Sequence, residues 1–82
     1  MAAKNNKYYP LCAYLKASGK ERVTLTRLQI EKILGFKLPQ SSRLSSWWAN
    51  DPDNGHTQAC GWVNAGYLVK TESSMFVFVR NS

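Results

Sequence analysis

Two adjacent tryptophans, Trp47 and Trp48, lie near the middle of a chain of only 82 residues. A tryptophan can bury on the order of 150–250 Å², and a domain of this size buries only about 60% of the surface of its unfolded chain. The elements on either side must therefore pack around at least one of these rings. Because adjacent side chains of an extended segment point to opposite faces, we expect one ring in the core. The other should lie at a surface, under a loop or in a binding groove.

The N-terminal part of the chain is patterned as a short tail followed by a helix. Residues 1–7 are polar and carry no capping signal, so we expect a flexible basic tail. Apolar residues spaced three and four apart predict an amphipathic helix over residues 8–18. Pro10 suits the first turn of this helix, and Gly19 suits the left-handed position that ends it.

A short strand and the best-marked helix of the chain follow. Residues 23–25 are rich in strand-forming side chains. Thr26 and Gln29 have the spacing of a capping box, in which each side chain bonds to a free backbone N–H at a helix start. The apolar spacing then predicts a helix over residues 27–34, with Gly35 at its end.

The C-terminal half is predicted to contain a short helical insert, a third main helix and a hairpin. Residues 36–54 would make an unusually long loop for so small a domain, so we expect a short helix within them. Apolar spacing predicts the third helix over residues 56–65. Residues 67–69 and 75–79 are strand-like and are joined by a short polar segment, which predicts an antiparallel β-hairpin.

This order of elements predicts a small winged-helix-like domain of the α+β class over residues 8–82. It has three main helices, a short helical insert, and a short strand that can pair with the C-terminal hairpin. The connection from Gly35 to His56 is longer than the tight turn of a helix-turn-helix. The prediction therefore depends on the order of the elements and not on a diagnostic motif.

The charge of the chain favours a polyanionic partner. Eleven Lys and Arg against five Asp and Glu give a formal net charge of +6, and such an excess favours nucleic acid through phosphate contacts and counterion release. The sequence has neither an apolar run long enough for a membrane span nor a start that resembles a signal peptide. We therefore expect a cytoplasmic protein, a monomer or a weak homodimer, with no membrane partner.

The residues that usually carry catalysis or bind metal are few. Cys12 and Cys60 lack further ligands at metal-binding spacing, so we expect two largely buried thiols and no metal or cofactor. His56 is the only histidine, and Asp51 and Asp53 lie in a segment typical of a surface turn. A metal-dependent nuclease site built from these three residues is conceivable, but turn formation already explains them. We therefore expect a protein that is not an enzyme.

The third predicted helix is the first candidate for reading nucleic acid. In a winged helix, the helix that precedes the hairpin enters the major groove and presents its N-terminal residues to base edges. The side chains in that position are those of His56, Thr57, Gln58, Gly61 and Asn64. In the alternative interpretation, His56 and Thr57 cap the helix, while Gln58 and Asn64 are simply solvated.

A serine-rich turn is the second candidate, and its role would be phosphate binding. Hydroxyls, backbone N–H groups and an arginine make good phosphate ligands, and Ser41, Ser42 and Arg43 supply them. The alternative is a polar surface turn whose Arg43 stacks on a neighbouring tryptophan. With two cations of the hairpin, the predicted nucleic-acid-binding set is Ser41, Ser42, Arg43, His56, Thr57, Gln58, Asn64, Lys70 and Arg80.

A second class of function is a protein-interaction module, such as an inhibitor or an accessory subunit from a mobile element. Tryptophan and tyrosine dominate binding hot spots, so exposed aromatic residues would form the contact. The candidates are Tyr8, Tyr9, Trp47, Trp48 and Phe76. In a self-associating version, the free edge of the hairpin would pair between two copies.

One further pattern runs through nearly the whole chain: Tyr9-Pro10-Leu11, Val23-Thr24-Leu25-Thr26, Ile30-Glu31-Lys32-Ile33-Leu34-Gly35, Leu38-Pro39 with Ser41, Trp47-Trp48-Ala49-Asn50-Asp51, His56 with Gln58-Ala59, Trp62, and Ala65-Gly66-Tyr67. In this pattern the chain resembles a family of small, largely uncharacterised bacterial domains. The resemblance implies a shared fold and brings no established activity. The chain departs from the family at Arg27, where an aromatic residue is more usual, and at Cys60-Gly61.

Overall fold

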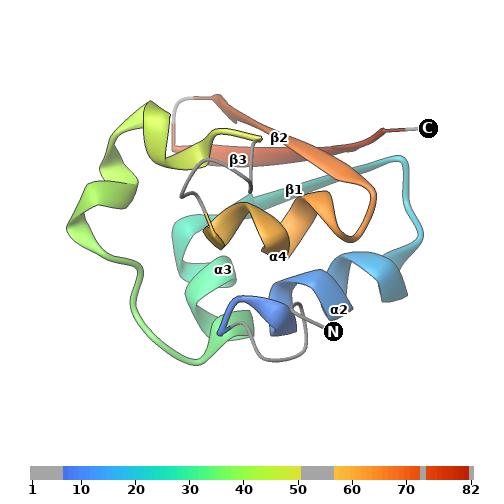
Figure 1. Ribbon diagram of the computed structural model, residues 1–82, viewed down its shortest axis with the longest axis horizontal. Helices are drawn as coiled ribbons and strands as arrows, with labels where there is room; N and C mark the ends of the chain where they lie inside the picture. Colours follow the sequence, from blue (N-terminus) through green and yellow to red (C-terminus); the bar gives the residue numbers. More distant parts are fainter. Residues whose placement is uncertain (1–6, 51–56, 73, 82) are drawn as a thin grey trace.

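The chain folds into two layers, with its α-helices on one face of an antiparallel sheet (Figure 1). The computed structural model describes residues 7–50, 57–72 and 74–81. The expected tail over residues 1–6, the turn at residues 51–55 and His56 lie outside the described residues. The elements follow in the order α2 (Tyr9–Ser18), β1 (Arg22–Thr26), α3 (Arg27–Leu34), η1 (Gln40–Arg43), η2 (Ser45–Trp48), η4 (Thr57–Ala59), α4 (Cys60–Val63), β2 (Tyr67–Glu72) and β3 (Met75–Arg80). For the described residues, a small α+β domain with three α-helices and a three-stranded antiparallel sheet is therefore confirmed.

The first two helices begin and end where their local signals indicate. At the start of α3, Thr26 Oγ1 accepts from the Gln29 N–H at 3.2 Å, and Gln29 Oε1 accepts from the Thr26 N–H at 2.8 Å, which completes the capping box. Gly19 ends α2 and Gly35 ends α3, both with positive φ. None of the described helices is long and apolar enough to cross a membrane.

The sheet has the strand order β1-β3-β2, and both pairs are antiparallel. Val23 of β1 and Val69 of β2 lie opposite Phe78 of the central strand, and Leu25 lies opposite Phe76. Residues directly opposite each other point to the same face, and all five of these side chains are buried. They form the sheet side of the core. The expected hairpin is confirmed, with six residues in each strand.

Aromatic rings form the centre of the core. Trp62 of α4 is fully buried and stacks on Trp48 with ring centroids 5.4 Å apart, and Trp48 stacks on Phe76 at 4.2 Å. As expected, one of the adjacent tryptophans, Trp48, is buried and the other, Trp47, is half-buried. They do not point to opposite faces, however, because they lie in a 3-10 helix, where consecutive side chains are about 120° apart. Their rings meet edge to face at 4.7 Å.

The predicted insert within residues 36–54 is not one helix but two single turns of 3-10 helix, η1 and η2. Leu44 between them is extended, with φ −88° and ψ 136°. This residue interrupts the helical path, so the serine-rich segment wraps around the end of the sheet (Figure 1).

The helix predicted over residues 56–65 is much shorter than expected. Its α-helical part, α4, covers only Cys60–Val63 and follows the 3-10 turn η4. The apolar spacing from which it was predicted is satisfied equally by a 3-10 turn followed by one α-helical turn. Gly61 lets this segment approach α2 closely, since a Cβ atom at Gly61 would lie 3.1 Å from the carbonyl oxygen of Tyr8.

Candidate anion-binding groove

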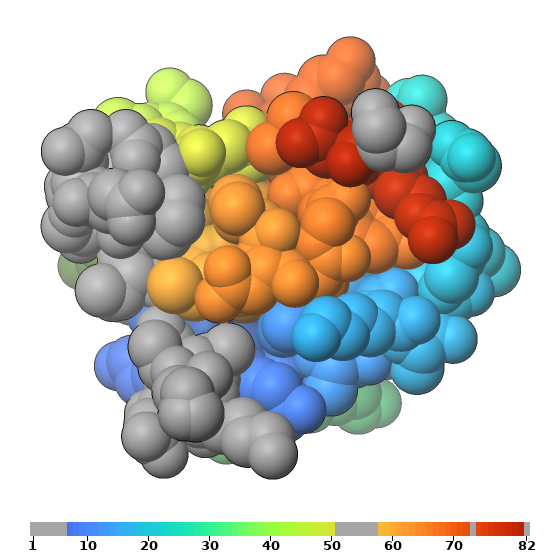
Figure 2. All heavy atoms as spheres, turned by 45° about the vertical axis from the view of Figure 1, so that its right-hand side comes forward, coloured from blue at the N-terminus to red at the C-terminus, as the bar shows by residue number. Residues whose placement is uncertain are grey.

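The helix that was predicted to contact DNA bases exposes little of its surface to solvent. α4 packs against α2, and in the space-filling view it lies at the surface as a band between α2 and the hairpin (Figure 2). Gln58 is 8% exposed, and its amide Nε2 donates to the carbonyl oxygen of Trp47 at 2.8 Å. The expectation of a solvent-facing Gln58 is therefore wrong. Asn64 is exposed at the end of α4, whereas His56 and the side chain of Thr57 lie outside the described residues.

The serine-rich turn has a different arrangement, because its middle residue is buried. Ser41 and Arg43 are exposed, but Ser42 is 1% exposed. The Ser42 hydroxyl donates to the Pro39 carbonyl and accepts from Arg27 Nη1 at 2.6 Å. The Ser42 carbonyl accepts from the Trp48 indole N–H at 2.7 Å and from Arg27 Nη2 at 3.4 Å. Ser42 thus holds Arg27 and the core in place and does not offer a free hydroxyl.

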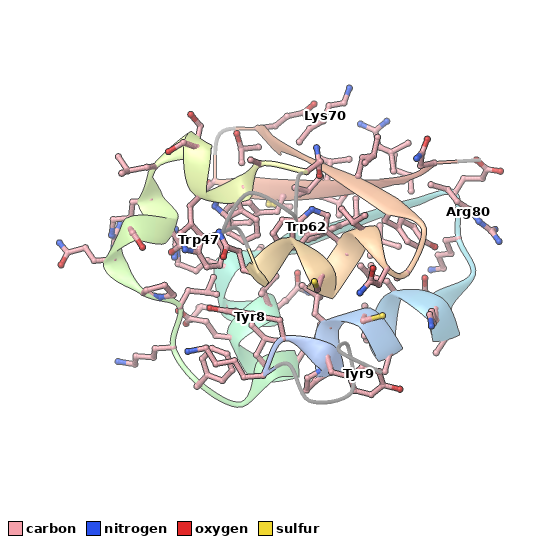
Figure 3. The ribbon with its side chains drawn as sticks, in the orientation of Figure 1. Tyr8, Tyr9, Trp47, Trp62, Lys70 and Arg80 are labelled. Atoms are coloured by element: carbon pink, nitrogen blue, oxygen red, sulfur yellow. The ribbon has the colours of Figure 1, made fainter. Side chains whose placement is uncertain are left out.

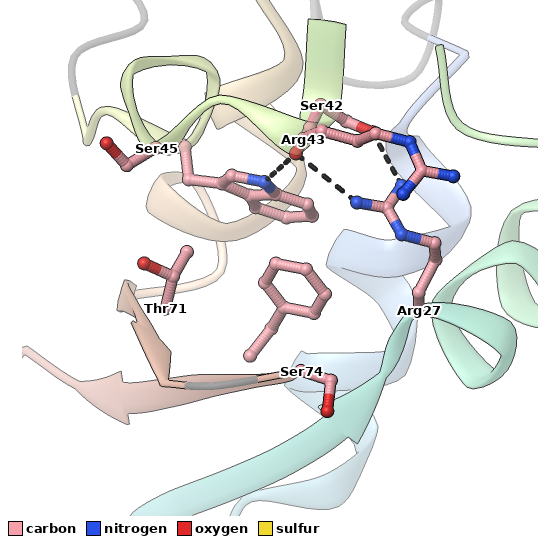
Figure 4. A pocket seen from close by; sticks show the side chains of 8 residues that line it. Arg27, Ser42, Arg43, Ser45, Thr71 and Ser74 are labelled. Carbon is pink, nitrogen blue, oxygen red and sulfur yellow. Dashed lines mark hydrogen bonds between the residues drawn. The ribbon is translucent and has the colours of Figure 1, made fainter. Parts of the chain in front are cut away.

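A groove of about 420 Å³ lies between this turn and the tip of the hairpin (Figure 4). It brings together α3, η1, η2, β2 and β3, which are far apart in the sequence. Its lining residues are Arg27, Ser42, Arg43, Ser45, Trp48, Thr71, Ser74 and Phe76. Of the described members of the predicted set, only Ser42 and Arg43 line it.

Arg27 was not predicted as a site residue, yet it forms one wall of the groove. It is the first residue of α3 and is half-buried, with its guanidinium carbon 5.8 Å from the centroid of the Phe76 ring. Two of its five N–H donors go to Ser42, and three remain for a ligand. No sequence pattern marked Arg27 as a ligand-binding residue.

The charged side chains that line the groove are cations. Among the residues that the structure describes, two guanidinium groups line it and no carboxylate does. Within the described residues, no hydrogen bond or ion pair engages the side chains of Arg43, Ser45, Thr71 or Ser74. A concave surface with two cations, free hydroxyls and no acid is suited to binding an anion.

The two predicted cations of the hairpin do not join this groove. Lys70 lies on β2 opposite Val77 and is exposed, while Arg80 lies at the far end of β3, opposite Tyr67. Arg80 Nη1 donates to the carbonyl oxygen of Gly19 at 3.1 Å. Figure 3 shows the two side chains at separate places on the sheet. The structure therefore separates Lys70 and Arg80 from Arg43.

A comparison with known families matches residues 8–81 to the family DUF7662, a domain of unknown function. The chain belongs to DUF7662. This family assignment agrees with the expected small, uncharacterised domain, although the residue pattern proposed for it is not tested. Neither the comparison with curated proteins nor the comparison with solved structures found a match.

The aromatic residues proposed for protein contact are mostly used inside the DUF7662 domain. Tyr8, Trp48 and Phe76 are buried, so the expectation that they are exposed is wrong. Tyr9 and Trp47 are half-buried. A chain this small needs its large rings in the core. The large apolar side chains that remain exposed are those of Tyr14, Leu28, Leu44 and Leu68.

The two cysteines of the DUF7662 domain are both free thiols, with Cys12 buried in α2 and Cys60 half-buried in α4. Burial raises the pKa of the Cys12 thiol; Lys16 works against this rise, and Cys60 adds to it. Within the described residues, no group of three or more His, Cys, Asp or Glu is placed to hold a metal ion.

We expect a thiol reagent at neutral pH to label Cys60 at least about tenfold faster than Cys12, because the reactive thiolate of Cys12 is both buried and disfavoured. A raised pKa means a smaller thiolate fraction at any given pH, so raising the pH should speed the Cys12 reaction. Rates followed by mass spectrometry in Cys12→Ser and Cys60→Ser variants assign the two phases. In denaturant the two labelling rates should converge. Equal rates in the native protein would contradict the prediction that burial protects Cys12.

Proposed function

We propose that this domain binds nucleic acid, in the first place duplex DNA, through phosphate contacts made by the groove between η1, η2 and the hairpin tip. The observation that carries the proposal is the pair of guanidinium groups, from Arg27 and Arg43, in a groove whose described lining contains no carboxylate. Arginine is well suited to phosphate because its planar fork can donate two parallel hydrogen bonds. The net charge of +6 favours the same partner.

The winged-helix-like interpretation fits this proposal. The element order and the sheet order β1-β3-β2, with a C-terminal hairpin, are those expected for such a domain. In this interpretation the β2-β3 hairpin is the wing, and its tip borders the groove through Thr71 and Ser74. Because α4 is short and Gln58 is turned inward, we propose backbone contacts near the wing tip with little sequence preference.

The test is a titration of the protein against a fluorescent DNA duplex at several salt concentrations. Binding should weaken steeply as salt rises. Arg43→Ala should weaken it about three- to tenfold and lower the salt slope by about one. Because the Arg43 side chain is exposed and has no partner among the described residues, its removal should leave the fold intact.

The matched control is Arg22→Ala. It removes an equal charge from the first residue of β1, at the end of this strand away from Arg27 and the groove. An unspecific charge effect would weaken binding equally in the two variants, and that result would count against the groove. No binding of the wild-type protein at low salt would end the proposal for duplex DNA.

A protein-interaction role remains the second candidate, supported by a different surface from the one first expected. Leu28 is 76% exposed and lies with Phe36 beside a mainly apolar hollow on α3. Lys32 and Lys37 border this hollow, which would suit an acidic segment with one apolar anchor. Failure of the DNA titration would leave this surface as the stronger candidate.

A further inference from the structure

The groove offers more hydrogen-bond donors than one bridging phosphate of a strand can use. Arg27 retains three N–H donors and Arg43 all five. The hydroxyls of Ser45, Thr71 and Ser74 also line the groove, but Figure 4 shows them pointing away from the two guanidinium groups, so the donors for one anion come from the two arginines. A bridging phosphodiester presents only two unesterified oxygens, while a terminal phosphate presents three.

The charge of the groove also favours a terminal phosphate. A bridging phosphate carries one negative charge, whereas a terminal phosphate monoester carries about −1.5 to −2 at neutral pH, since its second pKa is about 6. Two guanidinium groups, with no carboxylate among the described lining residues, match a dianion better than a monoanion.

One of the two cations is already in place before a ligand arrives. Ser42 and the face of Phe76 hold the guanidinium of Arg27, while Arg43 is exposed and free to close over a ligand. Preorganisation of this kind lowers the entropic cost of binding. The guanidinium of Arg27 is therefore held by the protein, while the exposed side chain of Arg43 can adjust to the ligand.

The aromatic residues that line the groove, Trp48 and Phe76, leave no binding surface for the base of a nucleotide. Trp48 and Phe76 stack on each other and are almost fully buried, so neither offers an open face to a base. Their apolar surface instead lowers the local dielectric constant behind the cations and strengthens their attraction for an anion. The base of a bound nucleotide therefore stays outside.

We propose that the groove binds the terminal phosphate monoester of a nucleotide, with the guanidinium groups of Arg27 and Arg43 as its ligands. This inference rests on the proposed nucleic-acid function and specifies the part of the partner that is recognised. The phosphate can come from a 5′-phosphorylated strand end or from a free nucleoside monophosphate.

The experiment compares two duplexes of one sequence, with 5′-phosphate or 5′-hydroxyl ends. The phosphorylated duplex should bind at least about tenfold more tightly at pH 7.5, because it supplies the extra charge and the third free oxygen. Arg43→Ala should remove most of this difference, and Arg22→Ala should preserve it. Lowering the pH to 5.5 should shrink the difference, as the phosphate takes up its second proton.

The outcomes separate the two proposals. Equal binding of both duplexes overturns the terminal-phosphate inference and leaves the nucleic-acid function standing. If neither duplex binds at low salt, the nucleic-acid function is wrong, and a titration with a nucleoside 5′-monophosphate then decides the inference. Binding of that nucleotide, lost in Arg43→Ala, would identify the free nucleotide as the source; no binding would overturn the inference as well.

Discussion

Replacing Trp62 with alanine should cost about 3–5 kcal/mol of folding free energy, the range expected for deleting a fully buried tryptophan. The ring stacks on Trp48, meets the edge of Phe78 at a centroid distance of 6.0 Å, and donates its indole N–H to Asn50 Oδ1 at 2.8 Å. Alanine would leave a cavity between the helix layer and the sheet, because none of these neighbours can collapse into the space without breaking another contact.

This loss is a large part of the total stability. A chain of 82 residues is expected to be stable by about 4–12 kcal/mol, so the variant should unfold at a clearly lower urea concentration, and it should be largely unfolded without urea only if the wild-type stability is near the lower end of this range. Urea denaturation followed by far-UV circular dichroism measures the loss without relying on tryptophan fluorescence. Trp62→Phe, which keeps an aromatic ring, and Trp47→Ala, at a half-buried position, should each cost clearly less. A Trp62→Ala variant no less stable than Trp47→Ala would contradict the central role of this ring.

The parts of the fold that were predicted correctly are encoded by neighbouring residues. Thr26, Gln29 and Gly35 set the limits of α3 through contacts within one or two turns. The hairpin is likewise predicted from two strand-like runs of residues with a short polar connection. In both cases the decisive hydrogen bonds join residues close in sequence, so a local pattern is sufficient.

The parts that were missed depend on contacts between distant segments. The length of α4 and the inward turn of Gln58 are set by packing against α2 and by the backbone of Trp47, neither of which is visible in the local pattern. The groove is a similar case: Arg43 was predicted from its serine-rich surroundings, whereas Arg27 and Thr71 join it only because β1, β2 and β3 form one sheet. Residue types alone do not reveal such a convergence.

Asn50 shows how such distant contacts can depend on one polar side chain. Its Oδ1 accepts from the Trp62 indole N–H at 2.8 Å and from the Val69 backbone N–H at 2.9 Å, and its Nδ2 donates to the Val69 carbonyl at 3.3 Å. A residue just after η2 thereby connects α4 to strand β2. Although Asn50 is exposed as a whole, these hydrogen bonds lie in partly buried surroundings.

We therefore expect Asn50→Ala to lower the folding free energy by about 2–3 kcal/mol, because it leaves two partly buried N–H donors without an acceptor. Asn50→Asp is the control, since it keeps the accepting oxygen but places a second acceptor oxygen where Nδ2 donates to the Val69 carbonyl. It should cost less than Asn50→Ala in the same urea titration, because both N–H donors keep an acceptor. If the two substitutions cost the same, the accepting oxygen is not what joins α4 to the sheet, and the shape of the side chain would have to be responsible.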